Sequence, residues 1–579
     1  MTIYEPLFYV SSIIIQICRK IVEKDFFFIR NNPSVLRLPC SSPSLMVTQE
    51  HESLLSDTDR THGRSALRNN VAAASALADA VRSTLGPKGL DKMLVNGGGE
   101  ETIVTNDGVT VLENAEVEHP TAKMLIAQSS AQDRQAGDGT TTTVILTAEL
   151  LQNALELVDI GVHPGLVERG YRIASKEAIK ELSNISKEAS EDDFLKSVMT
   201  SLSGKSDEGV REHLSQLAIE ASTSLTHEVE SGKDADESLV KKIYDRGRPS
   251  IESELVSGLV LAKDSLHPEM KMYPEGGKIL ILDGGISRRK PDIDINLKVT
   301  DTGMIAELNA QELADIENRV TAIAATGCNL LCVRDGVDDD ARGMLLKAGI
   351  TCYRRIEKPE LELLARTTGS TMVHDSALAR TEDLGEFTSL TSEKWGGVTH
   401  MKLVGSLKGG LTLIVRGTGK TRMDEVARGF DDAMGVACGL VRDPRVLPGG
   451  GATQMAIARH LRKFAPSITG REQLAIDAFA GALEAIPRIL AENAGLSPLD
   501  EVLRLNAAQE SNGSWTGLNM LNGEIEGMGE VGVIEPFGVT KNAISGAMGA
   551  AVSVLRIDDV LWANQDPSIP DWNPEESED

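Results

Sequence analysis

The stretch Gly137-Asp138-Gly139-Thr140-Thr141-Thr142-Thr143 places a carboxylate between two glycines at the start of an apolar segment, residues 140–159, that predicts a long helix. Glycines let the backbone approach a phosphate closely, and a helix N-terminus offers free N–H groups and the positive end of the helix dipole. Threonine hydroxyls donate to phosphate oxygens, and a single carboxylate suits the Mg²⁺ that accompanies a nucleotide. The stretch therefore predicts a Mg-nucleotide site, with a tight turn capped by threonine as the alternative.

Three other glycine-containing segments have the same character. Leu85-Gly86-Pro87-Lys88-Gly89 ends a segment of helical periodicity, and Asn106-Asp107-Gly108-Val109-Thr110 follows it. Far along the chain, Pro448-Gly449-Gly450-Gly451-Ala452 opens another predicted helix. Loops that suit a nucleotide therefore occur in both the first and the last third of the chain.

Taken in order, these segments resemble the group II chaperonins, the thermosome and TCP-1 family, and the resemblance covers roughly residues 57–563. The further matching segments are Met199-Thr200-Ser201-Leu202, Gln473-Leu474-Ala475-Ile476, Leu490-Ala491-Glu492-Asn493-Ala494-Gly495 and Arg556-Ile557-Asp558-Asp559. The resemblance implies a multidomain α+β chaperonin fold with a helical equatorial ATPase domain, a small intermediate domain and an α/β apical domain with a helical protrusion. An archaeal thermosome subunit fits better than a eukaryotic cytosolic ring subunit, because there is no long specialised insert.

The resemblance also implies domain boundaries. These are 46–188 and 447–563 for the equatorial domain, 189–256 and 411–446 for the intermediate domain, and 257–410 for the apical domain. Residues 185–245 read as polar and helical, whereas short apolar runs at 258–261, 279–282, 330–333 and 371–373 alternate with helical segments and predict an α/β region. The acidic tail, residues 564–579, is expected to be disordered.

An amphipathic segment at about 299–320 is interpreted as the family's lid protrusion. Its apolar residues are Ile305, Leu308, Leu313, Ile316 and Val320. The alternative is an ordinary helix packed on its own domain.

The net charge and the cysteine content of the chain bear on its binding partners and its cellular environment. The formal net charge of the 579 residues is −27, which argues against nucleic acid or an anionic membrane as the main partner. The six cysteines form no paired C-x-x-C motif, so we expect buried free thiols rather than a zinc site. Scattered thiols of this kind are typical of a reducing cytoplasm.

Residues 1–45 differ from the rest of the chain. They hold six aromatic residues and more basic than acidic residues, but their apolar run, residues 7–18, is too short to span a bilayer. Our hypothesis is that translation begins at Met46 and that the upstream part is non-native or disordered. An amphipathic anchor is the alternative, and N-terminal sequencing of the native protein distinguishes the two.

One segment is partly similar in sequence to a Walker A loop. Residues 411–421 read as a strand followed by Arg416-Gly417-Thr418-Gly419-Lys420-Thr421, but the first glycine of the Walker pattern is replaced by Ile414. The phosphate cradle would be incomplete, so we do not assign a nucleotide to this segment.

The resemblance implies the residues that bind nucleotide. They are Leu85, Gly86, Pro87, Asp138, Gly139, Thr140, Thr141, Thr142, Lys205, Gly450, Gly451, Asn519 and Glu535. Asp138 would hold Mg²⁺, Lys205 would sense the γ-phosphate, and Asn519 and Glu535 would lie near the adenine and the ribose. For Lys205 an exposed loop lysine is the alternative.

Two carboxylates match the family positions that activate the attacking water, Asp107 and Asp432. Asp432 is chosen over its neighbour Asp431 because the family register places the acid directly before Ala-Met. Without the resemblance, Asp432 would read as a solvated residue on a helix surface. Among departures from the family pattern, Gln454 replaces the usual Glu, which puts a salt bridge between subunits in doubt.

The function that the resemblance implies is that of an ATP-dependent molecular chaperone. Identical or paralogous subunits would form a double ring in the cytoplasm that encloses non-native proteins and uses ATP and Mg²⁺, without nucleic acid or membrane. A small-molecule phosphotransferase and a ring subunit without turnover are the alternatives.

Overall fold

The computed structural model describes residues 58–95, 102–115, 117–205, 207–229, 232–288, 302–407 and 410–563. The predictions for residues 1–45 and 564–579 lie outside these ranges. The chain divides into two compact units. In the smaller unit, β1 (Thr58–His62) pairs antiparallel with β21 (Asp559–Ala563), and Arg60 forms an ion pair with Asp559. All elements described below belong to the larger unit, Arg64–Asp558.

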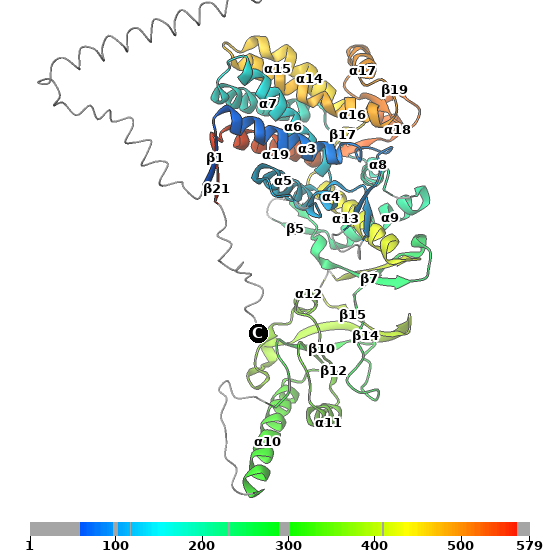
Figure 1. Cartoon of the computed structure of the whole chain (residues 1–579). Helices are drawn as coiled ribbons and strands as arrows, with labels where there is room; N and C mark the ends of the chain where they lie inside the picture. The colour runs from blue at the N-terminus through cyan, green and yellow to red at the C-terminus, as the bar shows by residue number, and fades with distance from the viewer. Residues whose placement is uncertain are drawn as a thin grey trace, which may run out of the picture. The chain divides into compact units, whose positions relative to one another are not determined.

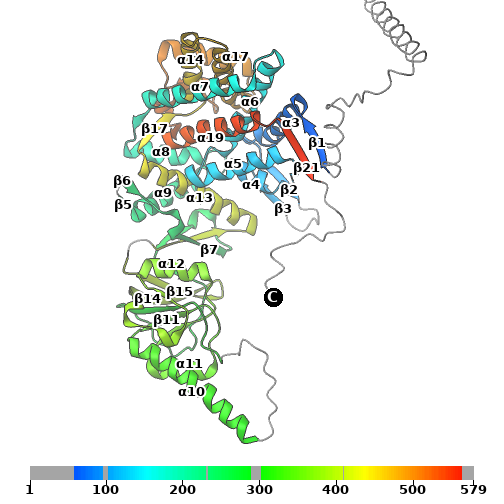
Figure 2. The ribbon, with the colours of Figure 1, turned by 90° about the vertical axis from the view of Figure 1, so that its left-hand side faces the viewer.

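The largest hydrophobic core is built by helices from both ends of the larger unit. Its buried residues lie within 67–185 and 447–555. The helices coloured blue and cyan in Figure 1 lie among the orange and red ones, and the view in Figure 2 agrees. The helices of these segments are α3 (Arg64–Arg82), α4 (Gly108–Glu113), α5 (Pro120–Ala136), α6 (Thr140–Asp159), α7 (Pro164–Ile185), α14 (Ala452–Phe464), α15 (Glu472–Leu483), α16 (Ala485–Asn493), α17 (Pro498–Asn512), α18 (Met528–Val531) and α19 (Phe537–Leu555).

Short strands connect these helices. The hairpin β2–β3 precedes α4, and the hairpin β18–β19 follows α17. A three-stranded sheet of order β20-β17-β4 joins segments that are distant in the sequence. The strands are β2 (Lys92–Val95), β3 (Thr102–Thr105), β4 (Lys187–Glu188), β17 (Arg445–Pro448), β18 (Thr516–Asn519), β19 (Glu524–Gly527) and β20 (Ile534–Pro536).

Helices α6 and α7 show how the sequence sets the local structure. The predicted helix over residues 140–159 is α6, whose buried residues include Val144, Leu150 and Leu151. The chain turns at Gly161, which has a positive φ of 94°. His163 then caps α7 by accepting a hydrogen bond from the backbone N–H of Gly165, and proline occupies the first turn, where its missing N–H costs nothing.

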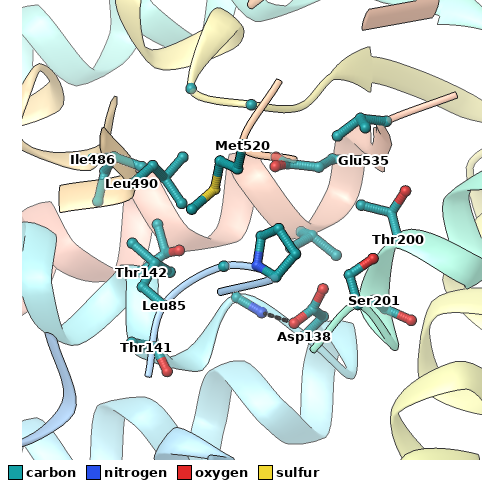
Figure 3. A pocket seen from close by; sticks show the side chains of 18 of the residues that line it. Leu85, Asp138, Thr141, Thr142, Thr200, Ser201, Ile486, Leu490, Met520 and Glu535 are labelled. Carbon is teal, nitrogen blue, oxygen red and sulfur yellow. Dashed lines mark hydrogen bonds between the residues drawn. The ribbon is translucent and has the colours of Figure 1, made fainter. Parts of the chain in front are cut away.

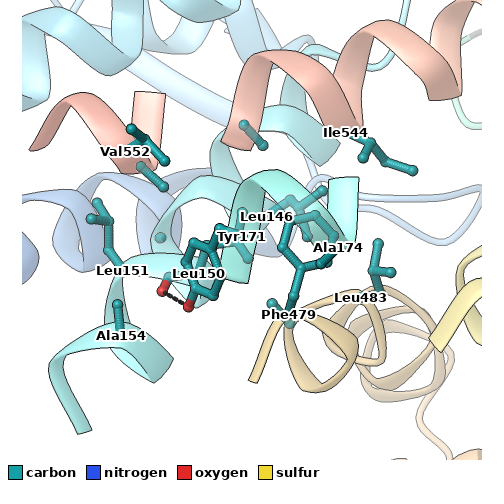
Figure 4. Packing of buried hydrophobic residues seen from close by; sticks show 14 of the residues in the cluster. Leu146, Leu150, Leu151, Ala154, Tyr171, Ala174, Phe479, Leu483, Ile544 and Val552 are labelled. Atoms are coloured by element: carbon teal, nitrogen blue, oxygen red, sulfur yellow. Dashed lines mark hydrogen bonds between the residues drawn. The ribbon is translucent and has the colours of Figure 1, made fainter. Parts of the chain in front are cut away.

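Aromatic packing marks the centre of this core (Figure 4). The rings of Tyr171 and Phe479 meet edge to face with their centroids 5.6 Å apart. The Tyr171 hydroxyl donates a 2.7 Å hydrogen bond to the carbonyl of Leu150, so the buried polar atom is satisfied. This contact ties α15, from the end of the chain, to α6 and α7.

A second core belongs to the segments between the helical core and a central sheet. Its helices are α8 (Glu191–Ser201), α9 (Glu208–Leu225) and α13 (Lys420–Arg442). They pack against a three-stranded sheet of order β7-β16-β8. The strands of this sheet are β7 (Val240–Arg246), β8 (Glu254–Ser257) and β16 (Leu411–Gly417). A separate hairpin consists of β5 (His227–Val229) and β6 (Gly232–Asp234), and the one-turn helices are η1 (Glu237–Leu239) and η2 (Ser250–Glu252).

The prediction that residues 185–245 are helical is wrong at their C-terminal end. Strand β7 lies there and pairs in parallel with β16, all seven residues of which are buried. Lys241, Lys242 and Asp245 make the β7 sequence look polar, and its pairing partner lies far away in the chain. Tertiary pairing therefore decides the structure of this segment.

The central region contains a seven-stranded sheet with helices on both faces, as Figure 2 shows. Leu280 and Leu282 of β10 face α10 and α11, whereas Ile279 and Ile281 face α12, in agreement with the period of a strand. The runs predicted as strands are β9, β10, β11 and β13. The elements are β9 (Leu259–Leu261), β10 (Gly277–Leu282), β11 (Leu330–Val333), β12 (Thr351–Tyr353), β13 (Met372–Val373), β14 (Gly385–Trp395), β15 (Val398–Gly405), α10 (Thr302–Thr326), α11 (Asp339–Ala348) and α12 (Lys358–Thr368), with one-turn helices η3 (Ser376–Leu378) and η4 (Thr381–Asp383).

The segment interpreted as a lid lies at the start of α10. Ile316 and Val320 are buried against the sheet, whereas Leu313 is 40% exposed. The side chains of Ile305 and Leu308 lie outside the described residues. The C-terminal half of α10 therefore packs as an ordinary helix, and the protrusion stays a prediction.

Two further observations concern the described residues. Cys328, Cys332, Cys352 and Cys438 are buried free thiols, as predicted, whereas Cys18 and Cys40 lie outside those residues. Among the helices that the structure describes, we find none with the length and apolarity needed to cross a bilayer.

Replacing Phe479 by alanine tests the helical core. The side chain is fully buried, so Phe479→Ala is expected to destabilise this core by about 3–5 kcal/mol. Leu474→Ala on the same helix is the control, because Leu474 is 43% exposed and surface substitutions change stability little. Urea unfolding followed by circular dichroism should show a lower midpoint for Phe479→Ala only, and equal midpoints would contradict the packing described.

Candidate functional site

A cavity of about 580 Å³ in the larger unit collects the predicted site residues, with one exception (Figure 3). Its wall includes Leu85, Gly86, Pro87, Asp107, Asp138, Gly139, Thr140, Thr141, Thr142, Lys205, Gly450, Gly451, Asn519 and Glu535. The exception, Asp432, does not line the cavity but forms an ion pair with Lys205, which does.

The loop between α5 and α6 presents Asp138 between two left-handed glycines. Gly137 ends α5 with φ 65°, and Gly139 precedes α6 with φ 81°. Gln132 holds the loop by donating a 2.9 Å hydrogen bond to the carbonyl of Asp138. Within the described ranges, no side chain caps the start of α6. The N–H groups of its first turn are therefore available to an anion in the cavity.

A second loop, Leu85-Gly86-Pro87, is fixed from α16. Asn493 donates two hydrogen bonds from its side-chain amide, at 3.1 Å to the carbonyl of Arg82 and at 2.9 Å to that of Leu85. Gly86 has φ 86°, and a Cβ there would lie 2.7 Å from the Leu490 side chain. The positive φ favours glycine at this position, and glycine also lets the loop pack closely on the Leu490 side chain.

A third loop, Asn106-Asp107-Gly108, packs on the start of α6. Asp107 caps α4 by accepting hydrogen bonds at Oδ2 from the N–H and the hydroxyl of Thr110, at 3.0 and 2.7 Å. A Cβ on Gly108 would lie 2.3 Å from the Thr141 hydroxyl. Asn106 donates a 2.8 Å hydrogen bond to the carbonyl of Gly204, so this loop also positions Lys205.

Lys205 and Asp432 join the cavity to α13. The Lys205 ammonium lies 2.7 Å from Asp432 Oδ2, and the two side chains are 19% and 13% exposed. Burial raises the pKa of Asp432 to about 7, and the carboxylates of Asp107 and Asp138 add to this against the lowering effect of Lys205. Burial by itself lowers the pKa of Lys205, but Asp432, Asp138 and Asp107 together raise that pKa above its ordinary value.

The carboxylates around Lys205 exceed the charge that it can neutralise. Burial raises the pKa of Asp138, and Asp107 raises it further, whereas Lys205 and a 2.8 Å hydrogen bond from the N–H of Gly139 lower it. Burial, together with the neighbouring carboxylates, raises the pKa of Asp133 to about 6. Such a site favours a cation. The described residues offer no cluster of three or more metal-ligating side chains, and Mg²⁺ characteristically takes only one or two protein carboxylates, a role that Asp138 would fill.

Two other predicted residues lie on the wall formed by the end of the chain. Burial raises the pKa of Glu535 to about 7, and Thr540 donates a 3.2 Å hydrogen bond to its Oε2. The Asn519 side chain bonds to its neighbours: its amide donates to Glu526 at 2.9 Å, and its oxygen accepts from the N–H of Leu521 at 3.0 Å. Asn519 therefore shapes the 519–521 turn, whereas Glu535 remains available as an acceptor.

The sequence analysis missed part of the wall. Ile486, Leu490 and Met520 supply apolar surface, and Thr200 and Ser201 add hydroxyls (Figure 3). Leu483 also belongs to the apolar part of the wall. Leu490, Thr200 and Ser201 lie in segments that match the family pattern, which was the available signal. Ile486 and Met520 carried no such signal, because an apolar residue looks the same in a core and in a cavity wall.

Gln454 is a further wall residue that was not predicted to line the site. It is 5% exposed and lines the cavity, and its Oε1 has no hydrogen-bond partner in the part of the chain that the structure describes. The replacement of the usual Glu by Gln at this position keeps a subunit-contact salt bridge in doubt, and this stays a prediction.

The residues of the Walker-like segment contribute nothing to the described cavity wall. They form β16, within a three-stranded sheet, and the start of α13.

Comparison with known proteins identifies the source of this arrangement. Residues 77–565 match the TCP-1/cpn60 chaperonin family. The chain belongs to this chaperonin family. It is 42% identical over 509 residues to a thermosome subunit of Methanocaldococcus jannaschii and 41% identical over 511 residues to thermosome subunit beta of Archaeoglobus fulgidus. Each alignment covers 87% of this chain and 93% of the relative.

The cavity of this chaperonin chain has the groups that a Mg-nucleotide needs. Phosphates require N–H and hydroxyl donors, which the first turn of α6 supplies through Thr140, Thr141 and Thr142. The buried carboxylate of Asp138 suits Mg²⁺, and the apolar side chains of Ile486 and Met520 suit a base. A volume of about 580 Å³ is in the usual range for a ligand pocket.

Removing the side chain of Asn493 tests the role of the Leu85-Gly86-Pro87 loop. Asn493→Ala loses two hydrogen bonds that hold the loop, so MgADP affinity should fall about tenfold, or about 1.4 kcal/mol. Asn512→Ala, at the exposed end of α17, is the control and should bind as wild type. Isothermal titration calorimetry measures both, and unchanged affinity of Asn493→Ala would show that the loop does not contact the nucleotide.

Proposed function

We propose that this chain is a subunit of a double-ring chaperonin that encloses non-native polypeptides and folds them with the energy of ATP hydrolysis. The observation that carries the proposal is the meeting of Asp107, Asp138, Lys205 and Asp432, which come from distant segments of the chain. Membership of the chaperonin family supports the same conclusion. A. fulgidus has both an alpha and a beta thermosome subunit among the relatives, so paralogous or identical subunits are proposed as partners. We place the assembly in the cytoplasm.

The three groups of elements would be the chaperonin domains. The helical core corresponds to an equatorial domain of residues 46–188 and 447–563, and the second core corresponds to an intermediate domain of residues 189–256 and 411–446. The sheet region, residues 257–410, would be the apical domain that binds clients, with the protrusion at about 299–320 as a built-in lid. The separate hydrophobic clusters support this division, because each group buries its own apolar residues.

Binding of ATP would use the loops around the cavity. Gly86, Gly139 and the first turn of α6 would surround the phosphates, and Asp138 would hold Mg²⁺. Bound Mg²⁺ supplies charge neutralisation to the phosphates. Gly450 and Gly451, with φ values of 61° and 70°, would let the backbone approach the base or the ribose, whose hydroxyls would donate to Glu535.

Asp432 is the stronger candidate for the group that takes a proton from the attacking water. Its pKa of about 7 matches a general base that works near neutral pH. One oxygen of Asp107 already caps α4, so Asp107 is better suited to orienting the water with its other oxygen. Lys205 would contact the γ-phosphate as a point charge and register its loss.

The positions of these residues would couple hydrolysis to movement. Asp432 lies on α13, in the second core, whereas Asp138 lies at the start of α6, in the helical core. Hydrolysis then requires α13 to be docked on the nucleotide loops, so the chemical step follows closure of the subunit.

The two alternatives make different predictions. A small-molecule phosphotransferase would be active as a monomer, and a silent ring subunit would form rings without turnover. Negative-stain electron microscopy and an ATPase assay of the wild type separate them from a chaperonin, which gives both double rings and turnover. An active monomer would reject the ring proposal, and inactive rings would reject the hydrolysis proposal.

Asp432→Ala tests the general base. Turnover should fall by about 100-fold or more, the usual contribution of a positioned general base, while double rings persist. Asp431→Ala is the matched control, because Asp431 is the adjacent acid and pairs with Lys242 instead. An ATPase assay on both variants decides the assignment, and an Asp432→Ala enzyme that turns over as fast as Asp431→Ala would refute it.

The pH dependence follows from the raised pKa of Asp432. A base must be ionised, so kcat/KM should rise as the pH rises through about 7 and then level off. Glu535 has a similar pKa, but its proposed role is binding, so Glu535→Gln should keep the same rising limb. The pH–rate profiles of the wild type and Glu535→Gln measure this, and loss of the limb in Glu535→Gln would reassign it to Glu535.

A further inference from the structure

The backbones of the loop that bears Asp138 and the helix that bears Asp432 touch at two glycines. A Cβ built on Gly137 would lie 2.5 Å from the Cα of Gly435, and a Cβ built on Gly435 would lie 2.6 Å from the Cα of Gly137. Real Cβ atoms essentially never approach other atoms below 3.0 Å. The two chain segments are therefore closer here than any side chain permits.

The positions of the two glycines connect this contact to the site. Gly137 directly precedes Asp138, and Gly435 follows Asp432 by three residues, about one helical turn. The contact therefore lies next to the proposed metal ligand on one segment and one helical turn from the proposed general base on the other. It joins residues of the helical core to a helix of the second core.

Gly435 has no reason in local structure to be glycine. It lies inside α13, which runs from Lys420 to Arg442, and does not have a positive φ. Glycine weakens a helix interior relative to alanine. Gly137 differs, because its φ of 65° favours glycine whatever its surroundings. The close approach of Gly137 is therefore the feature of the structure that explains glycine at position 435.

We propose that Gly137 and Gly435 are positioning residues whose backbone contact sets the distance between Asp138 and Asp432 during ATP hydrolysis. This inference rests on the proposed ATPase function. A methyl group on Gly435 needs at least 3.4 Å for an ordinary contact with Gly137, so α13 must retreat by about 1 Å, or the loop must shift. Either movement separates the base from the phosphates, and displacements of about 1 Å can cost about 100-fold in rate.

Few neighbouring atoms of position 435 can move to make room for a methyl group. The nearest other atom is Oε2 of Glu237 at 3.7 Å, beyond the backbone of Gly137 at 2.6 and 3.4 Å. The closest neighbours are thus backbone atoms, which cannot rotate away as a side chain can. We therefore expect displacement of the helix or the loop rather than local repacking.

The test is Gly435→Ala in the full-length protein, with Gly439→Ala as the control. Gly439 lies four residues further along the same helix, and a Cβ there meets nothing within 4 Å. Both substitutions favour the helix, but only the first pushes against Gly137. We expect kcat of Gly435→Ala to fall about 100-fold while its MgADP affinity and binding stoichiometry stay within about twofold of wild type. Gly439→Ala should match wild type in all three.

The pH dependence of kcat/KM separates mispositioning from partial unfolding. A smaller amount of folded enzyme lowers the rate but does not change the pH at which the rate rises. Retreat of α13 admits water around Asp432 and moves its carboxyl away from Lys205, Asp107 and Asp138, the charged groups that together with burial set its pKa. The rising limb of kcat/KM should therefore move in Gly435→Ala. An unchanged kcat, an unmoved limb, or equal losses of bound nucleotide and turnover would each overturn the positioning role. A wild type without turnover would instead reject the proposed function.

Discussion

The ion pair between Lys205 and Asp432 is the interaction on which the site depends. The two residues are 227 positions apart and come from a loop at the cavity and from α13. Both side chains are largely buried, so loss of Lys205 would leave the carboxylate of Asp432 without its partner, at a cost of about 3–5 kcal/mol. The pair thus holds α13 against the cavity. A bound γ-phosphate would compete for the same ammonium, which would leave Asp432 free to act on water.

The cavity also concentrates negative charge that the folded chain does not fully neutralise. Asp138, Asp432 and Glu535 all have raised pKa values, with burial as the first cause. An acid whose pKa is higher in the folded state than in the unfolded state destabilises the fold as the pH rises from its ordinary pKa to its folded pKa. These carboxylates therefore weaken the fold at neutral pH. Mg²⁺ would reverse much of this penalty, so ligand binding and stability are linked.

The loops that line the cavity could be singled out in the sequence, because each loop has a local chemical signature. Glycines beside a carboxylate and a run of threonines mark the α5–α6 loop, and the order of such segments indicated the family. The Lys205–Asp432 contact was not predictable from spacing, since it depends on tertiary structure. The apolar wall at Ile486 and Met520 and the strand β7 were missed for a related reason. Their roles come from partners that are distant in the sequence, not from their own residue types.

The interleaving of early and late helices has a consequence for biosynthesis. Helices α3 to α7 leave the ribosome long before α14 to α19, yet they bury their apolar faces against those later helices. The apolar faces of the early helices therefore stay exposed until the later helices are synthesised, which makes the nascent chain prone to aggregation. The nucleotide cavity, too, is closed only when Glu535 has been made. A protein proposed to protect other chains during folding thus passes through a long vulnerable stage of its own.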